Sequence, residues 1–218
     1  MATDRLKLYN GALLAIGRSR LASLTANEES RRLLDEVWND GAIDWCLEQG
    51  MWKFATRTQM LDYDNTFTAE FGYRRRFEKA TDWRATVAVC SDEFFRAPLT
   101  RYSDESGYIY SDIDRIYVKF VSNHADWGMN LASWPSSFTE FVKIYLAGKI
   151  AWKATKDKEI ENEFWKKGGK VDRAMDVAKN NDAQDDPTKF IPPGNWVMSR
   201  RGMKSSWRDG GSRSRLIG

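Results

Sequence analysis

The chain has a single histidine, two cysteines and no long apolar run. One histidine excludes metal sites that need two, and any Ser-His-Asp arrangement would have to use His124. That residue lies in a polar stretch just after an expected strand, so we interpret it as a structural loop histidine. A zinc site would need Cys46, Cys90, His124 and a carboxylate to converge without any closely spaced ligand pair. We therefore expect no metal and no cofactor.

The two cysteines, Cys46 and Cys90, each lie within an apolar segment, which predicts two buried free thiols. The first apolar run, residues 13–16, is interrupted at once by Gly17 and Arg18, unlike a signal peptide. No segment approaches the roughly 20 apolar residues that a membrane span requires. We expect a soluble protein without a membrane anchor, made in a reducing cytoplasm.

Aromatic residues are abundant, with ten tryptophans and an aromatic share of 13%. These side chains supply much of the burial in folded proteins, so the 218-residue chain is expected to form a domain, with or without an insertion. The net charge of +3 is unevenly placed, because residues 196–218 hold six basic groups and one acidic group. The remaining residues hold 28 basic and 30 acidic groups, so a nearly neutral body precedes a cationic tail.

That tail, residues 187–218, combines prolines and glycines with arginines and two tryptophans. Such a segment has no periodic apolar pattern for a core, but it has aromatic anchors and guanidinium donors. We expect an extended arm that becomes ordered on a partner. Its candidate binding residues are Trp196, Arg200, Arg201, Lys204, Trp207 and Arg208.

Residues 1–51 are expected to form a helical hairpin. The first helix is indicated by apolar residues three and four apart, namely Leu6, Tyr9, Leu13 and Ile16. Thr25 and Glu28 have the spacing of a capping box, which predicts that the second helix begins at Thr25 and ends near Gly50. Its apolar stripe consists of Leu34, Trp38, Ala42 and Trp45.

In residues 52–130 the apolar period changes from near 3.6 to 2, which indicates strands. The alternating segments are residues 67–77, 83–89 and 116–120, and turn signals occur at residues 62–65, 79–82, 103–107 and 112–114. About five short strands are expected, arranged as a small antiparallel sheet or barrel.

Residues 131–186 return to a helical pattern. Ser137 and Glu140 again have capping-box spacing, and Gly148 marks a place for close helix contact. A last helical stretch, residues 160–178, is weakened by Gly168 and Gly169, where a kink is expected. The predicted fold is therefore α+β: an antiparallel helical bundle with an inserted β domain and an extended C-terminal arm. The two helical pairs are expected to bury Trp38, Trp45, Tyr145 and Trp152 between them.

Other motifs that suggest chemistry are weak. The pairs Asp62/Asp64 and Asp112/Asp114 lack the glycine and glutamate of a calcium loop, so we interpret them as turn formers. The sequence Gly168-Gly169-Lys170 lacks the spacing of a phosphate loop. No reaction is assigned, and we do not expect an enzyme.

Arg74, Arg75 and Arg76 lie between aromatic residues, a combination that can bind nucleic acid through charge and stacking. On a strand, however, Arg74 and Arg76 point to one side and Arg75 to the other. A solvated face with one inward or interfacial arginine is the simpler interpretation.

Several segments, in order along the chain, resemble a head–tail adaptor of the tail tubular protein A family of short-tailed bacteriophages. They are LYNGALLAIG at residues 8–17, SLT at 23–25, the aromatic helix of residues 34–52 ending in GMWKFA at 50–55, WPSSF at 134–138, PPGNW at 192–196 and SRRG at 199–202. The likeness covers nearly the whole chain, although each motif is loose.

This resemblance implies a structural virion protein that forms a homo-oligomeric ring, usually a dodecamer, between the portal and the tail. The helical domains would surround the DNA channel, and the arm would dock on the portal protein. The β domain would face the tail nozzle, fibres or spikes. Assembly would take place in the host cytoplasm.

Two alternatives remain open. The basic tail and Arg74–Arg76 would also suit a nucleic-acid-binding module, whose binding would weaken steeply with salt. A tail-associated cell-wall hydrolase would need a convergent pair of carboxylates, and the many Asp and Glu residues leave that arrangement possible.

Overall fold

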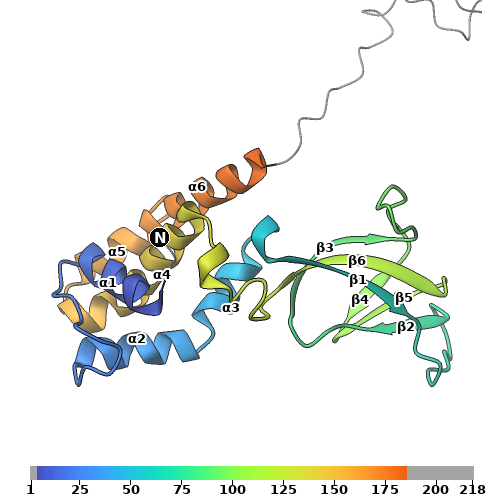
Figure 1. The fold of residues 1–218 in the computed structure, drawn as a ribbon, viewed down its shortest axis with the longest axis horizontal. Helices are drawn as coiled ribbons and strands as arrows, with labels where there is room; N and C mark the ends of the chain where they lie inside the picture. The colour runs from blue at the N-terminus through green and yellow to red at the C-terminus, as the bar shows by residue number, and fades with distance from the viewer. Residues whose placement is uncertain (1–3, 186–218) are drawn as a thin grey trace, which may run out of the picture. The chain divides into compact units, whose positions relative to one another are not determined.

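A computed structural model describes residues 4–185, so the expected arm and all six of its candidate binding residues lie outside the described residues. The described part has the predicted α+β class, and its strands lie in sequence between two sets of helices (Figure 1). The helices are α1 (Arg5–Ala15), α2 (Glu29–Asn39), α3 (Ala42–Glu48), α4 (Ser136–Thr155), α5 (Lys158–Trp165) and α6 (Lys170–Gln184).

The first helix is confirmed, because α1 buries Leu8, Tyr9, Ala12 and Leu13 along one face. The predicted start of the second helix at Thr25 is wrong, since α2 begins at Glu29. Instead of capping a helix, Thr25 bonds to Ser23: its backbone N–H donates to Ser23 Oγ at 3.3 Å. The Ser and Thr hydroxyls satisfy the turn locally and leave the helix to start later.

A second correction concerns the predicted helix to Gly50, which is two helices. Gly41 adopts φ = +85°, a left-handed conformation that ends α2 and lets the chain restart as α3. Glycine reaches this conformation without a steric penalty. The apolar spacing of Trp38, Ala42 and Trp45 continued across the break and so did not reveal it.

The strands form two three-stranded antiparallel sheets rather than the single sheet or barrel expected. One sheet has the order β1-β6-β3, and the other has the order β2-β5-β4. Their bounds are β1 (Thr56–Asp62), β2 (Arg75–Glu78), β3 (Trp83–Cys90), β4 (Ser103–Glu105), β5 (Tyr108–Ser111) and β6 (Arg115–Ser122).

The alternating segment of residues 67–77 forms a strand only in its last part, where β2 pairs with β5. The preceding residues, 65–74, form a loop that begins with an Asx turn, in which Asp64 Oδ1 accepts the backbone N–H of Thr66 at 2.8 Å. Alternation alone therefore over-predicted the strand, because a strand also needs a neighbour to pair with.

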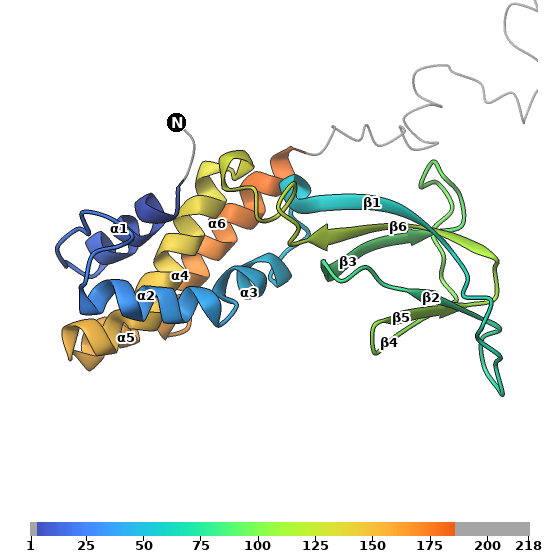
Figure 2. The same ribbon diagram turned by 60° about the horizontal axis from the view of Figure 1, so that its bottom comes forward.

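The two sheets face one another across a small apolar core (Figure 2). Trp83 lies parallel to Phe120, with ring centroids 4.1 Å apart. On one side the sheets are joined by the backbone, since Asp64 N–H donates to the carbonyl of Arg76 at 2.8 Å. On the other side β3 and β4 are sheet edges, and we call the space between them the seam. The core consists of Phe77, Val89, Ile109, Ile116, Val118 and Phe120.

The helices after the sheets also depart from the sequence signals. The N-cap of α4 is Pro135, without a side-chain cap, so the predicted capping box of Ser137 and Glu140 does not form. The kink expected at Gly168 and Gly169 is a complete break between α5 and α6. α5 ends at Trp165, and Gly168, with φ = +69°, lies in the turn before α6 begins at Lys170.

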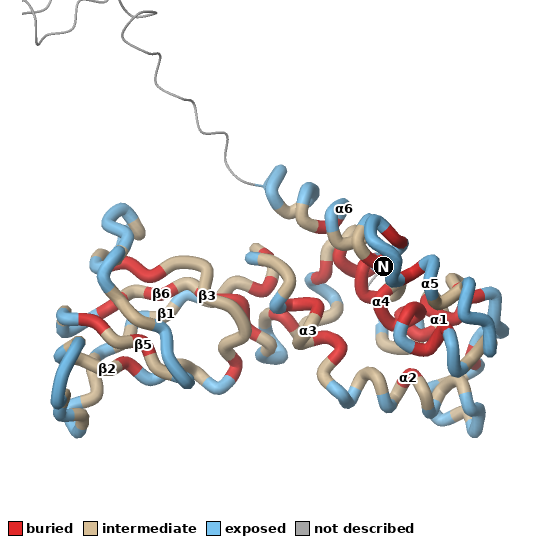
Figure 3. Tube along the Cα trace, turned by 180° about the vertical axis from the view of Figure 1, so that it is seen from behind, coloured by how far each residue is buried: buried red, intermediate tan, exposed pale blue. Residues whose placement is uncertain are grey.

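The close contact expected at Gly148 is confirmed: a Cβ there would lie 3.2 Å from Phe164 and Trp165. The helices share a larger core to which α4 contributes the most buried residues, with further ones from α1 and α3 (Figure 3). Tyr145 is buried as expected, whereas Trp45, which stacks on it with ring centroids 4.4 Å apart, is only partly buried. Trp38 is only partly buried, and Trp152 is 39% exposed, so the expectation that it is buried is wrong.

Polar contacts join the β1-β6-β3 sheet to α3. Arg84 of β3 pairs with Asp44 at 3.1 Å, and Asn123 after β6 donates to the same carboxylate at 2.8 Å. Val121 of β6 lies in the helical core. Helices and sheet are thus held by both apolar and charged contacts.

Candidate functional site

The arginine cluster at residues 74–76 is largely engaged within the fold. Arg75 donates to Asp114 at 2.8 Å and lies 3.9 Å from the centre of the Tyr63 ring. Arg76 is bound to Asp64 and lies between Phe67 and Tyr108, with ring-centre distances of 4.8 and 4.5 Å. Arg75 and Arg76 therefore have intramolecular partners on opposite sides of β2.

The aspartates near the strand ends act as partners of these and other arginines. The hydrogen bond from Arg76, helped by Thr66, lowers the pKa of Asp64 to about 2. Asp62 accepts a hydrogen bond from Arg115 at 2.6 Å, and Asp112 accepts the backbone N–H of Arg74 at 3.2 Å. Within residues 4–185, no three His, Cys, Asp or Glu side chains come together as a possible metal site.

His124 helps to form the loop after β6. Its Nδ1 accepts the backbone N–H of Asp126 at 3.3 Å, and its ring packs edge-on against Trp127. The nearby Ser122 hydroxyl donates to Asp82 and not to this histidine. The arrangement is that of a structural loop residue.

Both cysteines are buried and free, as predicted. Burial raises the pKa of the Cys46 thiol well above its ordinary value, and it also raises that of Cys90. Thiols in this state are poor nucleophiles. None of the described helices is long and apolar enough to cross a membrane.

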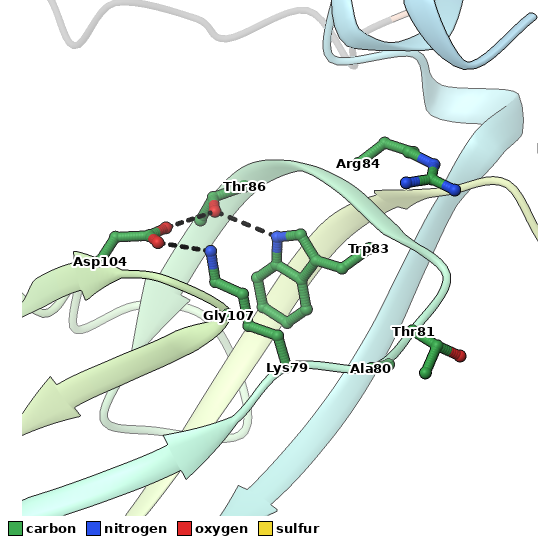
Figure 4. Close-up of a pocket in the computed structure, with 8 residues that line it drawn as sticks. All are labelled: Lys79, Ala80, Thr81, Trp83, Arg84, Thr86, Asp104 and Gly107. Carbon is green, nitrogen blue, oxygen red and sulfur yellow. Dashed lines mark hydrogen bonds and ion pairs between the residues drawn. The ribbon is translucent and has the colours of Figure 1, made fainter. Parts of the chain in front are cut away.

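The seam between β3 and β4 contains an open hollow of about 590 Å³ (Figure 4). Trp83 Nε1 donates to Thr86 Oγ1 at 3.2 Å, and that hydroxyl donates to Asp104 at 3.1 Å. Asp104 also pairs with Lys79, whose amine lies 5.2 Å from the centre of the Trp83 ring. These four side chains form a bridge between the sheets, and Asp104 is the one carboxylate among the residues that line the hollow.

A second hollow of about 440 Å³ lies on the β2-β5-β4 sheet, and we call it the outer-face hollow. Tyr110 of β5 alternates with the buried Ile109, and its register partner on β4 is Ser103. Successive side chains of a strand point to opposite faces of the sheet, so Tyr110 projects away from the core in which Ile109 lies. Ser103, opposite Tyr110 on β4, projects from the same face. The residues that line the hollow include Phe67, Glu70, Phe71, Tyr73, Glu105 and Tyr110.

The outer-face hollow is aromatic and acidic. The Phe67 and Tyr110 rings meet edge-on with centroids 5.7 Å apart, and Phe71 is 89% exposed. The lining residues include two carboxylates, Glu70 and Glu105, and no basic side chain. Both carboxylates are exposed, unlike the buried acid that a glycoside hydrolase keeps protonated. The arrangement is better suited to binding a cation than to proton transfer.

The bundle presents a third surface, which is aromatic and basic. Lys149 lies 5.4 Å from the ring centre of Tyr145 and 5.5 Å from that of Trp165. Lys158 lies 5.5 Å from Trp152. Burial raises the pKa of Tyr145 to about 12, so this ring remains a neutral phenol. The tryptophans are partly exposed, which leaves apolar area for a partner.

No family model matches the chain, and no curated protein is similar to it by sequence. Sequence reasoning missed both hollows. Each is formed by segments far apart in the chain, and neither has a compact motif.

Proposed function

We propose that this chain is the structural subunit of a homo-oligomeric ring that joins the portal of a tailed bacteriophage to its tail and completes the DNA-ejection channel. The observation that carries the proposal is the presence of large exposed apolar side chains on several different helices of one bundle. A subunit that acts alone has little use for such surfaces.

A closed ring requires two unlike patches on each subunit, which meet head to tail. Leu14 of α1 is 62% exposed and Val177 of α6 is 54% exposed. Both helices pack against α4, and Trp152 and Trp165 add further exposed apolar area. These helices provide separate surfaces for the two neighbours of a subunit.

The chain order supports the same assignment. Helices, a β insertion and further helices follow one another, as the resemblance to the tail tubular protein A family implies, and the basic segment follows them. In this proposal the portal binds the arm through Trp196, Arg200, Arg201, Lys204, Trp207 and Arg208. The β part contacts nozzle, fibre or spike proteins.

The charge balance is compatible with DNA passing through the ring. Residues 1–195 carry nearly equal numbers of acidic and basic groups. A strongly basic channel would bind phosphates and slow transit. The neutral body therefore suits a conduit better than a DNA-binding surface.

Light scattering of the purified full chain tests ring formation. A dodecamer of the 25.2 kDa chain would have a mass of about 300 kDa. Leu14→Lys or Val177→Lys should lower the mass toward that of a monomer, because each puts a charge into an apolar contact. The matched control is Phe94→Lys, an exposed aromatic of the sheet part, which should leave the mass unchanged. Full-size rings from both helix variants would count against these contacts.

Portal binding tests the role of the arm. A chain ending at Asp186 keeps both apolar cores of the described residues and should stay folded, but it should no longer bind the portal. Binding at full strength by this truncated chain would contradict the assignment of the arm.

The alternative, a nucleic-acid-binding module, can be tested by measuring how its affinity for nucleic acid depends on salt concentration. It predicts that the logarithm of affinity falls steeply with the logarithm of salt concentration, by roughly 0.9 for each phosphate contact. The intramolecular partners of Arg75 and Arg76 favour a flat response or none. A steep slope would support the alternative.

A further inference from the structure

We infer that the outer-face hollow is a recognition site for an arginine side chain, carried by an extended segment of a different protein. The site itself is argued from its lining. Its placement on the tail side of a virus particle rests on the proposed function.

The lining has the groups that bind a guanidinium. Arginine is planar, stacks on aromatic faces and donates to carboxylates in a fixed fork. Phe67, Phe71, Tyr73 and Tyr110 supply the rings, and Glu70 and Glu105 supply the carboxylates. Within the described residues, neither glutamate has an ion-pair partner; Glu105 accepts a hydrogen bond from Ser103.

The same face already holds one guanidinium in this way. Arg76 lies between Phe67 and Tyr108 and is bound to Asp64, so two rings and one carboxylate suffice to hold it. The outer-face hollow presents the same kinds of group beside it, and neither of its carboxylates forms an ion pair with a side chain of residues 4–185. An external arginine would complete a second site of the same chemistry.

The carboxylates of the lining and the free edge of β4 indicate which class of ligand fits the outer-face hollow. Two carboxylates repel phosphate, so the lining disfavours nucleic acid and favours a basic protein segment. Glu105 belongs to β4, which pairs with β5 on one side only and forms an edge of its sheet. Exposed edges accept extended segments by backbone pairing, and side-chain pockets then give specificity. An extended segment with an arginine satisfies both features.

The test uses the full chain labelled with 3-fluorotyrosine and a model peptide, acetyl-Gly-Ser-Gly-Arg-Gly-Ser-Gly-amide. The fluorine signals of Tyr73 and Tyr110, assigned with single Tyr→Phe variants, should shift and saturate as the peptide is added. The buried Tyr145 serves as an internal control and should not respond. A peptide with citrulline in place of arginine should produce no saturable shift, because it lacks the charge.

Substitutions of the lining glutamates measure how much each carboxylate contributes to the affinity for the arginine peptide. Glu70→Gln and Glu105→Gln should each weaken arginine-peptide binding about two- to fivefold, the range for an exposed ion pair. The control Glu93→Gln changes an exposed carboxylate of another loop and should leave the affinity unchanged.

Three results would overturn the assignment. The first is equal binding of the citrulline and arginine peptides, and the second is unchanged binding of the arginine peptide after both glutamates are replaced. The third is a shift of the Tyr73 and Tyr110 signals that depends on protein concentration in the absence of peptide, which would mean that a second copy fills the hollow. Light scattering of the same samples keeps the two proposals apart: a monomer that binds arginine contradicts only the ring, and a ring that does not bind arginine contradicts only this site.

Discussion

Replacing Trp83 tests whether the seam and the core between the two sheets hold the β part together. Trp83 stacks on the fully buried Phe120, and its Nε1 donates to Thr86 at the edge of the seam. Trp83→Ala removes a half-buried ring, its stacking and its hydrogen bond. Trp83→Phe keeps an aromatic ring on Phe120 and removes the hydrogen bond.

The magnitude follows from these contacts. Loss of a fully buried Trp costs about 3–5 kcal/mol, so a half-buried ring is worth about 2 kcal/mol. The stacked pair adds about 0.5–1.5 kcal/mol, and the hydrogen bond adds about 1 kcal/mol. Trp83→Ala should therefore destabilise the protein by about 3.5–4.5 kcal/mol, and Trp83→Phe by about 1 kcal/mol.

Urea and thermal unfolding monitored by circular dichroism measure both effects. In a domain of this size, each kcal/mol lowers Tm by about 2–4 °C. We expect a fall of roughly 7–18 °C for Trp83→Ala and roughly 2–4 °C for Trp83→Phe. If both variants unfold like the unaltered chain, Trp83 does not hold the sheets together and the proposed packing is wrong.

Other predictions follow from the same contacts. Gly148→Val should lower the free energy of unfolding by about 1–3 kcal/mol, because it forces α5 away from α4, whereas Lys149→Val on the exposed side of the helix should cost less. The raised pKa values of Cys46 and Tyr145 favour their neutral forms in the folded state, so stability is fully present below about pH 9 and should fall as the pH rises toward 12. Urea midpoints at pH 8 and pH 10.5 measure this fall, and equal midpoints would contradict it. Native Cys46 and Cys90 should react with a thiol reagent far more slowly than the unfolded chain does, and equal rates would show that the thiols are accessible.

The sequence predicted those elements that are determined by a local pattern of apolar or small residues. The first helix, the strands at residues 83–90 and 115–122, and the contact at Gly148 are all present. Their signals are local, because a face of fixed period or a missing side chain is visible without knowledge of the neighbours. The same holds for Cys46 and Cys90, whose apolar surroundings indicated burial.

Where the sequence failed, distant or competing contacts decided the outcome. Thr25 was expected to cap a helix, but its local bond with Ser23 is an alternative that spacing cannot distinguish. Trp152 fell on the predicted apolar face of α4, yet no helix covers it fully. The outer-face hollow depends on a loop folding over a sheet, so Glu70 and Glu105 gave no signal as a pair.

The mass of the full chain in solution, with and without a bacteriophage portal protein as the proposed partner, tests the proposed ring most directly. Light scattering together with electron microscopy should reveal a closed ring of about 300 kDa, or its formation on the portal. A chain that stays at 25.2 kDa at all concentrations, and does not assemble when the portal is added, would contradict the account.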